Sequence, residues 1–222
     1  MIEMSLKERQ RLRTMSHFID ATYEIIEEEG IDNVSVRKVA DIAGYNIGTL
    51  YNYFKNIDHL IGYTGVKYLK DYYAVLDDYI RDAENAEERY IKIWELFCMY
   101  SFDMPEIWKA IFFLTPRGGI RELLDGYFAI YPEDYGEHDE DLIPMLNSSS
   151  IYERSRMCLD PVAKAGIIPE ECVDEINEMT VLVYRGILER FITQKGELDK
   201  KVEIEKFKRY VRIGVDACRI KK

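Results

Sequence analysis

Apolar residues recur at spacings of three and four along most of the chain, as on one face of an α-helix. In the first such stretch, about residues 6–29, Met15, Phe18, Ile19 and Ile26 share a side and Gly30 ends the pattern. Further helices are expected at about residues 57–79, 120–131, 150–165, 169–194 and 199–219. The pattern therefore predicts an all-α fold.

Residues 34–55 predict two short helices joined by a tight turn. Ser35 can cap the first helix, and Gly44 can adopt the left-handed conformation that ends it. Asn46 can cap the second helix, whose Leu50 and Phe54 face inward. Ile47, Thr49, Asn52 and Tyr53 then look outward. This arrangement is typical of a helix-turn-helix, whose second helix enters the DNA major groove.

The residues of this stretch resemble one family closely. The runs Val-Arg-Lys-Val-Ala-Asp-Ile-Ala-Gly (36–44) and Gly-Thr-Leu-Tyr-Asn-Tyr-Phe-Lys (48–55), followed by Asp58-His-Leu60, resemble the TetR family of bacterial transcriptional regulators. The resemblance covers about residues 10–65, and the remainder matches only in being helical. It implies a three-helix, helix-turn-helix DNA-binding domain over residues 1–55. A larger helical ligand-binding and dimerisation domain would cover residues 56–222.

The resemblance also implies which residues meet DNA. Positions matching Arg37, Ile47, Gly48, Thr49, Asn52 and Tyr53 approach bases, and those matching Ser35, Tyr51 and Lys55 approach the backbone. The full expected DNA-binding set is Ser35, Arg37, Lys38, Tyr45, Asn46, Ile47, Gly48, Thr49, Tyr51, Asn52, Tyr53 and Lys55. Chemically, Arg37 suits a guanine edge and Asn52 suits adenine. The chain departs from the family pattern at Lys38, Ile47 and Ile57, which leaves its base preferences open.

The charge balance is compatible with DNA binding once it is divided along the chain. The whole chain has a net charge of −11. Residues 1–70 hold 9 basic and 10 acidic residues, whereas residues 71–222 hold 21 and 31. Since salt screens fields beyond about 10 Å, local placement of the basic groups matters more than net charge. The basic start of the first helix, at Lys7, Arg9, Arg11 and Arg13, either reaches phosphates or is simply a solvated helix end.

The family resemblance implies a homodimer, a palindromic DNA operator and a small-molecule effector that releases the DNA. The last two long helices have apolar faces suited to pairing with a second copy, although they could instead complete the monomer core. The aromatic and sulfur-bearing residues predict a partly apolar effector pocket. The candidates are Trp94, Phe97, Cys98, Tyr100, Ser101, Met104, Trp108, Phe112, Tyr127, Met157, Met179 and Tyr184. The effector, the operator sequence and the sign of regulation stay open; repression is only the family's usual mode.

Three local features can be interpreted either as purely structural or as functional. His59 is expected to be a surface or capping residue rather than a catalytic one. Gly62 and Gly65 fall inside a helix, so they mark a bend, a close packing point or mere tolerance. Residues 132–144 are rich in acidic residues and proline, which predicts an exposed loop rather than a cation site.

Other functional classes find little support. The histidines are His17, His59 and His138, and none of them forms a Glu-x-x-His pair or a recognisable catalytic constellation. No phosphate-binding glycine loop or C-x-x-C pair is present, so we expect a non-enzyme without metal or cofactor. No apolar run is long enough to span a membrane, and reduced cysteines suit a cytoplasmic location. The alternative is a helical interaction protein, or a ligand sensor, that has lost DNA binding.

Overall fold

The computed structural model describes residues 5–114 and 119–220. Every regular element in this described part is helical, and it contains no strand, which confirms the all-α prediction. None of the described helices combines the length and the hydropathy that a membrane span requires.

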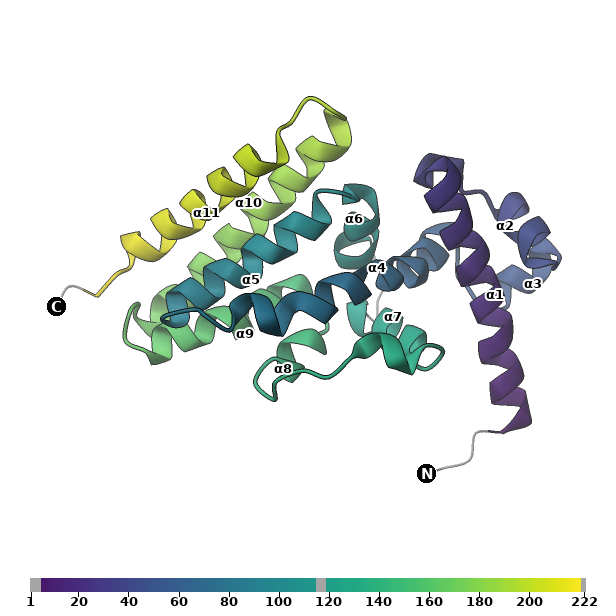
Figure 1. Ribbon diagram of the computed structural model, residues 1–222, viewed down its shortest axis with the longest axis horizontal. Helices are drawn as coiled ribbons and strands as arrows, with labels where there is room; N and C mark the ends of the chain where they lie inside the picture. The colour runs from purple at the N-terminus through teal and green to yellow at the C-terminus, as the bar shows by residue number, and fades with distance from the viewer. Residues whose placement is uncertain (1–4, 115–118, 221–222) are drawn as a thin grey trace. The chain divides into compact units, whose positions relative to one another are not determined.

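The chain forms two compact units (Figure 1). The first contains Met1–Lys70 and Glu106–Tyr135, and the second contains Asp71–Pro105 and Gly136–Lys222. The first unit thus extends beyond residue 55, since the described residues 56–70, 106–114 and 119–135 belong to it together with the N-terminal helices. Where DNA-binding and ligand-binding functions divide stays a prediction.

The first unit begins with helix α1, Leu6–Glu29, as expected. Ser5 caps it by accepting a hydrogen bond from Glu8 N at 3.1 Å, and Gly30 ends it with a φ of +85°. Its buried face carries Met15, Phe18 and Ile19. A single helical turn, η1 (Ile31–Asn33), then leads into the helix-turn-helix.

Helices α2 (Val36–Ala43) and α3 (Ile47–Tyr51) form the expected pair. Gly44 takes a φ of +75° between them, and its N–H and that of Tyr45 bond back to α2 carbonyls. Leu50 and Phe54 are buried, with Phe54 edge-on to Phe18 of α1 at a centroid distance of 6.1 Å. These inward contacts fix the orientation of α3 on α1.

Helix α4 (Ile57–Ile80) follows, and its first half packs with α6 (Pro105–Phe113) and α7 (Gly119–Phe128) in the first unit. Glycines in α4 permit the close approach of α6 and α7. A Cβ on Gly65 would lie 2.8 Å from Ile111 Cγ1, and one on Gly62 would lie 3.0 Å from Leu123 Cδ1. The close-packing interpretation of these glycines is therefore correct.

The acidic segment 132–144 is only partly the exposed loop that was expected. Residues Pro132–Tyr135 form a helical turn, η2, in which Asp134 is buried. Its carboxylate accepts a hydrogen bond from Tyr127 at 2.7 Å and pairs with Lys70 at 2.7 Å. The prediction failed here because a carboxylate tolerates burial when it is paired, and sequence spacing does not reveal the partner. Among the described residues, no cluster suited to a metal ion is found.

The second unit is a bundle of longer helices. It contains α5 (Ala86–Ser101), α8 (Ile143–Leu146), α9 (Ile151–Lys164), η3 (Glu170–Cys172), α10 (Val173–Thr193) and α11 (Lys200–Ala217). Asn85, Ser150 and Asp199 cap α5, α9 and α11 through their side chains. Helices α10 and α11 run side by side (Figure 1). Trp94 joins the core between them, with its ring centroid 5.2 Å from Tyr184 and 5.4 Å from Phe207.

Candidate functional site

The helix-turn-helix is held by its two caps. Ser35 Oγ accepts from Lys38 N at 3.3 Å, and Asn46 Oδ1 accepts from Thr49 N at 2.8 Å. Thr49 Oγ1 also donates to Asn46 Oδ1 at 3.1 Å. The two cap side chains thus satisfy free N–H groups at the starts of α2 and α3. Their first role is to shape the motif.

Eight of the expected DNA-binding residues are solvent-exposed: three of them are the caps Ser35 and Asn46 and the ion-paired Lys55, and the other five lie on α2, on α3 or directly after α3. We call these five the recognition surface: Arg37, Ile47, Gly48, Tyr51 and Asn52. Ile47 and Tyr51 are 42% and 52% exposed, so apolar and aromatic surface is available to a partner on this side of the motif. An exposed guanidinium, amide and aromatic hydroxyl beside apolar atoms can contact both phosphates and base edges.

Two expected DNA contacts are largely occupied with packing. Tyr45 is half-buried; its ring lies 5.2 Å from Phe18, and its hydroxyl is 3.1 Å from His17 Nδ1. Tyr53 is half-buried as well, 6.4 Å from the Phe18 ring, so it does not look fully outward as expected. Thr49 is also half-buried. The spacing alone could not show this, because α3 ends at Tyr51 and the following residues curl back toward α1.

The basic residues of the motif differ in their surroundings. The Arg37 side chain is exposed, whereas Lys38 forms an ion pair with Glu29 at the end of α1. Lys55 donates to both carboxylate oxygens of Glu122 on α7, each at 3.0 Å. Sequence reasoning missed Glu122, because nothing in the sequence connects it to a residue 67 positions earlier.

His59 links this ion pair to the backbone. The residue is 4% exposed, so the expectation of a surface position was wrong and that of a capping role was right. Its Nδ1 accepts a hydrogen bond from Lys55 N at 3.1 Å, and its Nε2 lies 3.6 Å from Glu122 Oε1. Burial lowers the pKa of His59, against the opposing effect of Glu122, so the neutral ring is favoured.

The residues expected to line an effector pocket fall into both units. Trp108, Phe112 and Tyr127 are buried in the first unit. The other nine belong to the second unit: Trp94, Phe97, Cys98, Tyr100, Ser101, Met104, Met157, Met179 and Tyr184. Of these, Met157 and Met179 are about 40% and 39% exposed on α9 and α10.

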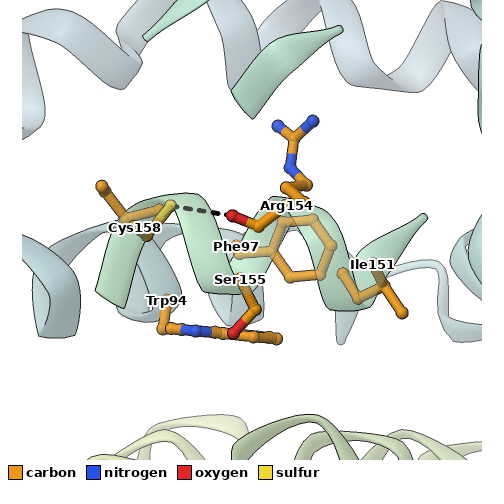
Figure 2. A pocket seen from close by; sticks show the side chains of 7 residues that line it. Trp94, Phe97, Ile151, Arg154, Ser155 and Cys158 are labelled. Carbon is orange, nitrogen blue, oxygen red and sulfur yellow. Dashed lines mark hydrogen bonds between the residues drawn. The ribbon is translucent and has the colours of Figure 1, made fainter. Parts of the chain in front are cut away.

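The second unit contains a cavity of about 10 Å³ between α5 and α9 (Figure 2). Trp94 and Phe97, two of the candidate pocket residues, line it. Five further residues that sequence reasoning missed complete the lining: Ile93, Ile151, Arg154, Ser155 and Cys158. Figure 2 shows Ser155 directed toward the Trp94 ring, while Arg154 extends to the opposite side. A volume of this size holds about one water molecule.

The cavity wall is apolar with a polar edge. The Tyr90 hydroxyl lies 3.5 Å from Ser155 Oγ, and burial raises its pKa to about 12. Within the described part of the chain, the buried Trp94 Nε1 and Thr180 Oγ1 have no hydrogen-bond partner of normal geometry. Burial also raises the pKa of the Cys158 thiol to about 12. The lining therefore combines neutral groups, at Trp94, Ser155 and Cys158, with the charged residue Arg154.

Comparison with known proteins agrees with this geometry. Residues 18–64 match the sequence model of "Bacterial regulatory proteins, tetR family". An HTH-type transcriptional regulator of Staphylococcus aureus (strain bovine RF122 / ET3-1) is 29% identical over 84 residues, which are 36% of this chain and 42% of that protein. The match thus spans less than half of that relative. Another, from S. aureus strain USA300, is 22% identical over 157 residues, covering 65% of this chain and 80% of its own.

Solved structures extend the likeness in fold to nearly the whole chain. RolR in complex with the ligand resorcinol aligns with a TM-score of 0.60 and 18% identity, covering 92% of this chain and 89% of its own. Thermus thermophilus FadR, a TetR family transcriptional repressor in complex with lauroyl-CoA, aligns with a TM-score of 0.60 and 14% identity, covering 90% and 94%. At such identities the likeness to solved structures shows the fold alone. The match to the family's sequence model is confined to the N-terminal part, where residues 18–64 form a helix-turn-helix domain of the tetR family of bacterial regulatory proteins.

Proposed function

We propose that this regulator is a repressor that binds a palindromic DNA operator as a homodimer and releases it when a small molecule enters the second unit. The observation that carries the proposal is the recognition surface. It presents Arg37, Tyr51 and Asn52 to solvent on a helix pair whose inner side is fully packed.

In this proposal α3 enters the major groove. Some side chains of the helix-turn-helix contact base edges and others contact phosphates. Asn52 and Arg37 offer the bidentate donors that adenine and guanine edges accept. Ile47 offers an apolar contact to a thymine methyl. Tyr51, Ser35 and Lys55 meet phosphates, which set the register of the protein on the duplex.

The proposed dimer uses α10 and α11. Large apolar side chains are exposed along these two helices: Met179, Leu182, Val202, Tyr210 and Ile213, at 39–57% exposure. A second copy would bury them in a four-helix arrangement. A twofold axis also places two α3 helices about 34 Å apart or a multiple of that, which is why the operator should be a near palindrome.

The effector is proposed to bind where α5 faces α9. RolR and FadR were both solved with ligands that combine an apolar part with polar groups: resorcinol is an aromatic ring with two hydroxyls, and lauroyl-CoA is an acyl chain on charged coenzyme A. In this chain the cavity beside Trp94 and Ser155 is too small for such a molecule. Entry must therefore separate α5 from α9, so ligand-free and ligand-bound conformations differ, as population-shift regulation requires.

The test measures DNA binding and effector response in the same protein. Asn52→Ala should remove specific binding while leaving the helical content unchanged. Ser155→Thr, which adds one methyl group beside this one-water cavity, should bind the operator normally but respond less to the effector. Specific DNA binding that survives Asn52→Ala and Tyr51→Ala together would contradict the proposal. Complete absence of DNA binding would favour an interaction protein or ligand sensor without a DNA target.

A further inference from the structure

The ion pair between Lys55 and Glu122 occupies a group that the proposed function assigns to DNA. Lys55 Nζ lies 3.0 Å from both Glu122 carboxylate oxygens. We propose that Glu122 restrains Lys55 in the DNA-free protein, so that a DNA phosphate must displace this carboxylate and Glu122 sets the affinity for the operator. The inference rests on the proposed function, because it concerns how the same DNA-binding surface is tuned.

The position of the Glu122 backbone is fixed by the packing of its helix, α7, against α4. Helix α7 approaches α4 so closely that a Cβ on Gly126 would lie 2.4 Å from the Tyr63 ring. The Tyr63 hydroxyl also reaches the Glu122 carbonyl oxygen, at 3.4 Å. The backbone of Glu122 is thereby fixed beside the start of α4, and its carboxylate faces the residues that follow α3.

The backbone of Lys55 is fixed from the same side. Its N–H donates to His59 Nδ1 at 3.1 Å, and His59 N donates to Asn56 Oδ1 at 2.8 Å. With Nδ1 accepting, the neutral ring carries its proton on Nε2, which lies 3.6 Å from Glu122 Oε1. The carboxylate therefore faces one cation and one N–H donor, and the Lys55 side chain is 50% exposed to solvent.

A DNA phosphate and the Glu122 carboxylate would compete for Lys55. A phosphate and the Glu122 carboxylate both require the Lys55 ammonium, and two anions placed around it repel each other. The pair is weak enough to exchange, since the Lys55 and Glu122 side chains are 50% and 36% exposed. An exposed ion pair changes an equilibrium constant by about 1.4- to 5-fold, so two copies in a dimer change it by about 2- to 30-fold.

Glu122 lies on α7, outside the helix-turn-helix. Its ion pair with Lys55 would therefore allow a change elsewhere in the first unit to alter DNA affinity. Any shift of α7 that lengthens the Lys55–Glu122 distance alters DNA affinity without moving α2 or α3. Glu122 thus acts through Lys55 as a positioning residue and has no need to touch DNA itself.

The experiment compares operator affinity for wild type, Glu122→Gln, Lys55→Met and the double variant, by fluorescence anisotropy of labelled DNA. We expect Glu122→Gln to tighten binding about 2- to 30-fold, and to have little effect in the Lys55→Met background. The logarithm of the DNA-binding constant falls linearly with the logarithm of the salt concentration. Lys55→Met should make this slope shallower by about 0.9 for each phosphate that loses its neutralising cation. Asp125→Asn is the matched control, since it makes the same charge change on α7 but Asp125 pairs with Arg121.

Three results would overturn the inference. One is unchanged or weaker binding by folded Glu122→Gln. Another is equal tightening with and without Lys55, and the third is equal tightening by Asp125→Asn. If Glu122→Gln fails to fold, Glu122→Ala replaces it in the same cycle. Absence of specific DNA binding by every variant would overturn the proposed function itself, whereas binding by Glu122→Gln alone would support the restraint.

Discussion

Three helical glycines in the first unit form a graded test of the packing of α4 with α6 and α7. Replacing glycine by alanine adds only a Cβ, and each replacement gains up to ~1 kcal/mol of helix propensity. The three sites differ in the distance from the new Cβ to its nearest side chain. The new Cβ would lie 3.0 Å from a flexible Leu123 tip at Gly62, 2.8 Å from Ile111 Cγ1 at Gly65, and 2.4 Å from the Tyr63 ring at Gly126.

Overpacking a filled core costs about 1–3 kcal/mol, and rigid neighbours make the cost larger. Set against the propensity gain, Gly62→Ala should be close to neutral. Gly65→Ala should lose about 1 kcal/mol of unfolding free energy and Gly126→Ala about 2 kcal/mol. Urea unfolding followed by circular dichroism measures these values, at one fixed protein concentration because the proposed dimer would make stability depend on concentration. Equal effects at the three sites, or a stabilised Gly126→Ala, would refute the close packing of α7 on α4.

Further predictions concern DNA reading, protonation and assembly. Arg37→Ala should cost about 1–3 kcal/mol on the operator and relax preference at one base pair, whereas Tyr51→Ala should weaken binding to all DNA sequences alike. Competition with operators mutated at single positions distinguishes the two. Burial lowers the pKa of His59, so the unfolded chain takes up a proton first as pH falls. Stability should therefore decline below about pH 6.5, and His59→Gln should remove that part of the decline in urea titrations between pH 7.5 and 5.5. Leu182→Glu or Ile213→Glu should yield folded monomers in sedimentation experiments and lose operator binding; a dimer that persists would count against the α10–α11 interface.

Much of the helix-turn-helix was predictable because its determinants are local. A cap at Ser35, a left-handed residue at Gly44 and a cap at Asn46 act within four residues of their own positions. The inward placement of Leu50 and Phe54 likewise follows from helical spacing. For such features the sequence contains all the interacting groups.

Long-range partners set the limit of prediction. The burial of Asp134 depends on Lys70 and Tyr127, and the engagement of Lys55 depends on Glu122. These contacts join residues that are not neighbours in any local pattern. The same holds for the cavity, because the spacing of aromatic residues identified Trp94 and Phe97 but could not indicate that α9 supplies Arg154, Ser155 and Cys158.

The most direct measurement is binding of the purified protein to the DNA upstream of its own gene at two salt concentrations. We expect specific binding of one dimer to each near-palindromic site, steeply weakened by salt and abolished by Asn52→Ala. Failure to bind any such DNA at low salt, by protein shown to be dimeric and free of bound small molecules, would contradict the claim that this helix-turn-helix reads an operator.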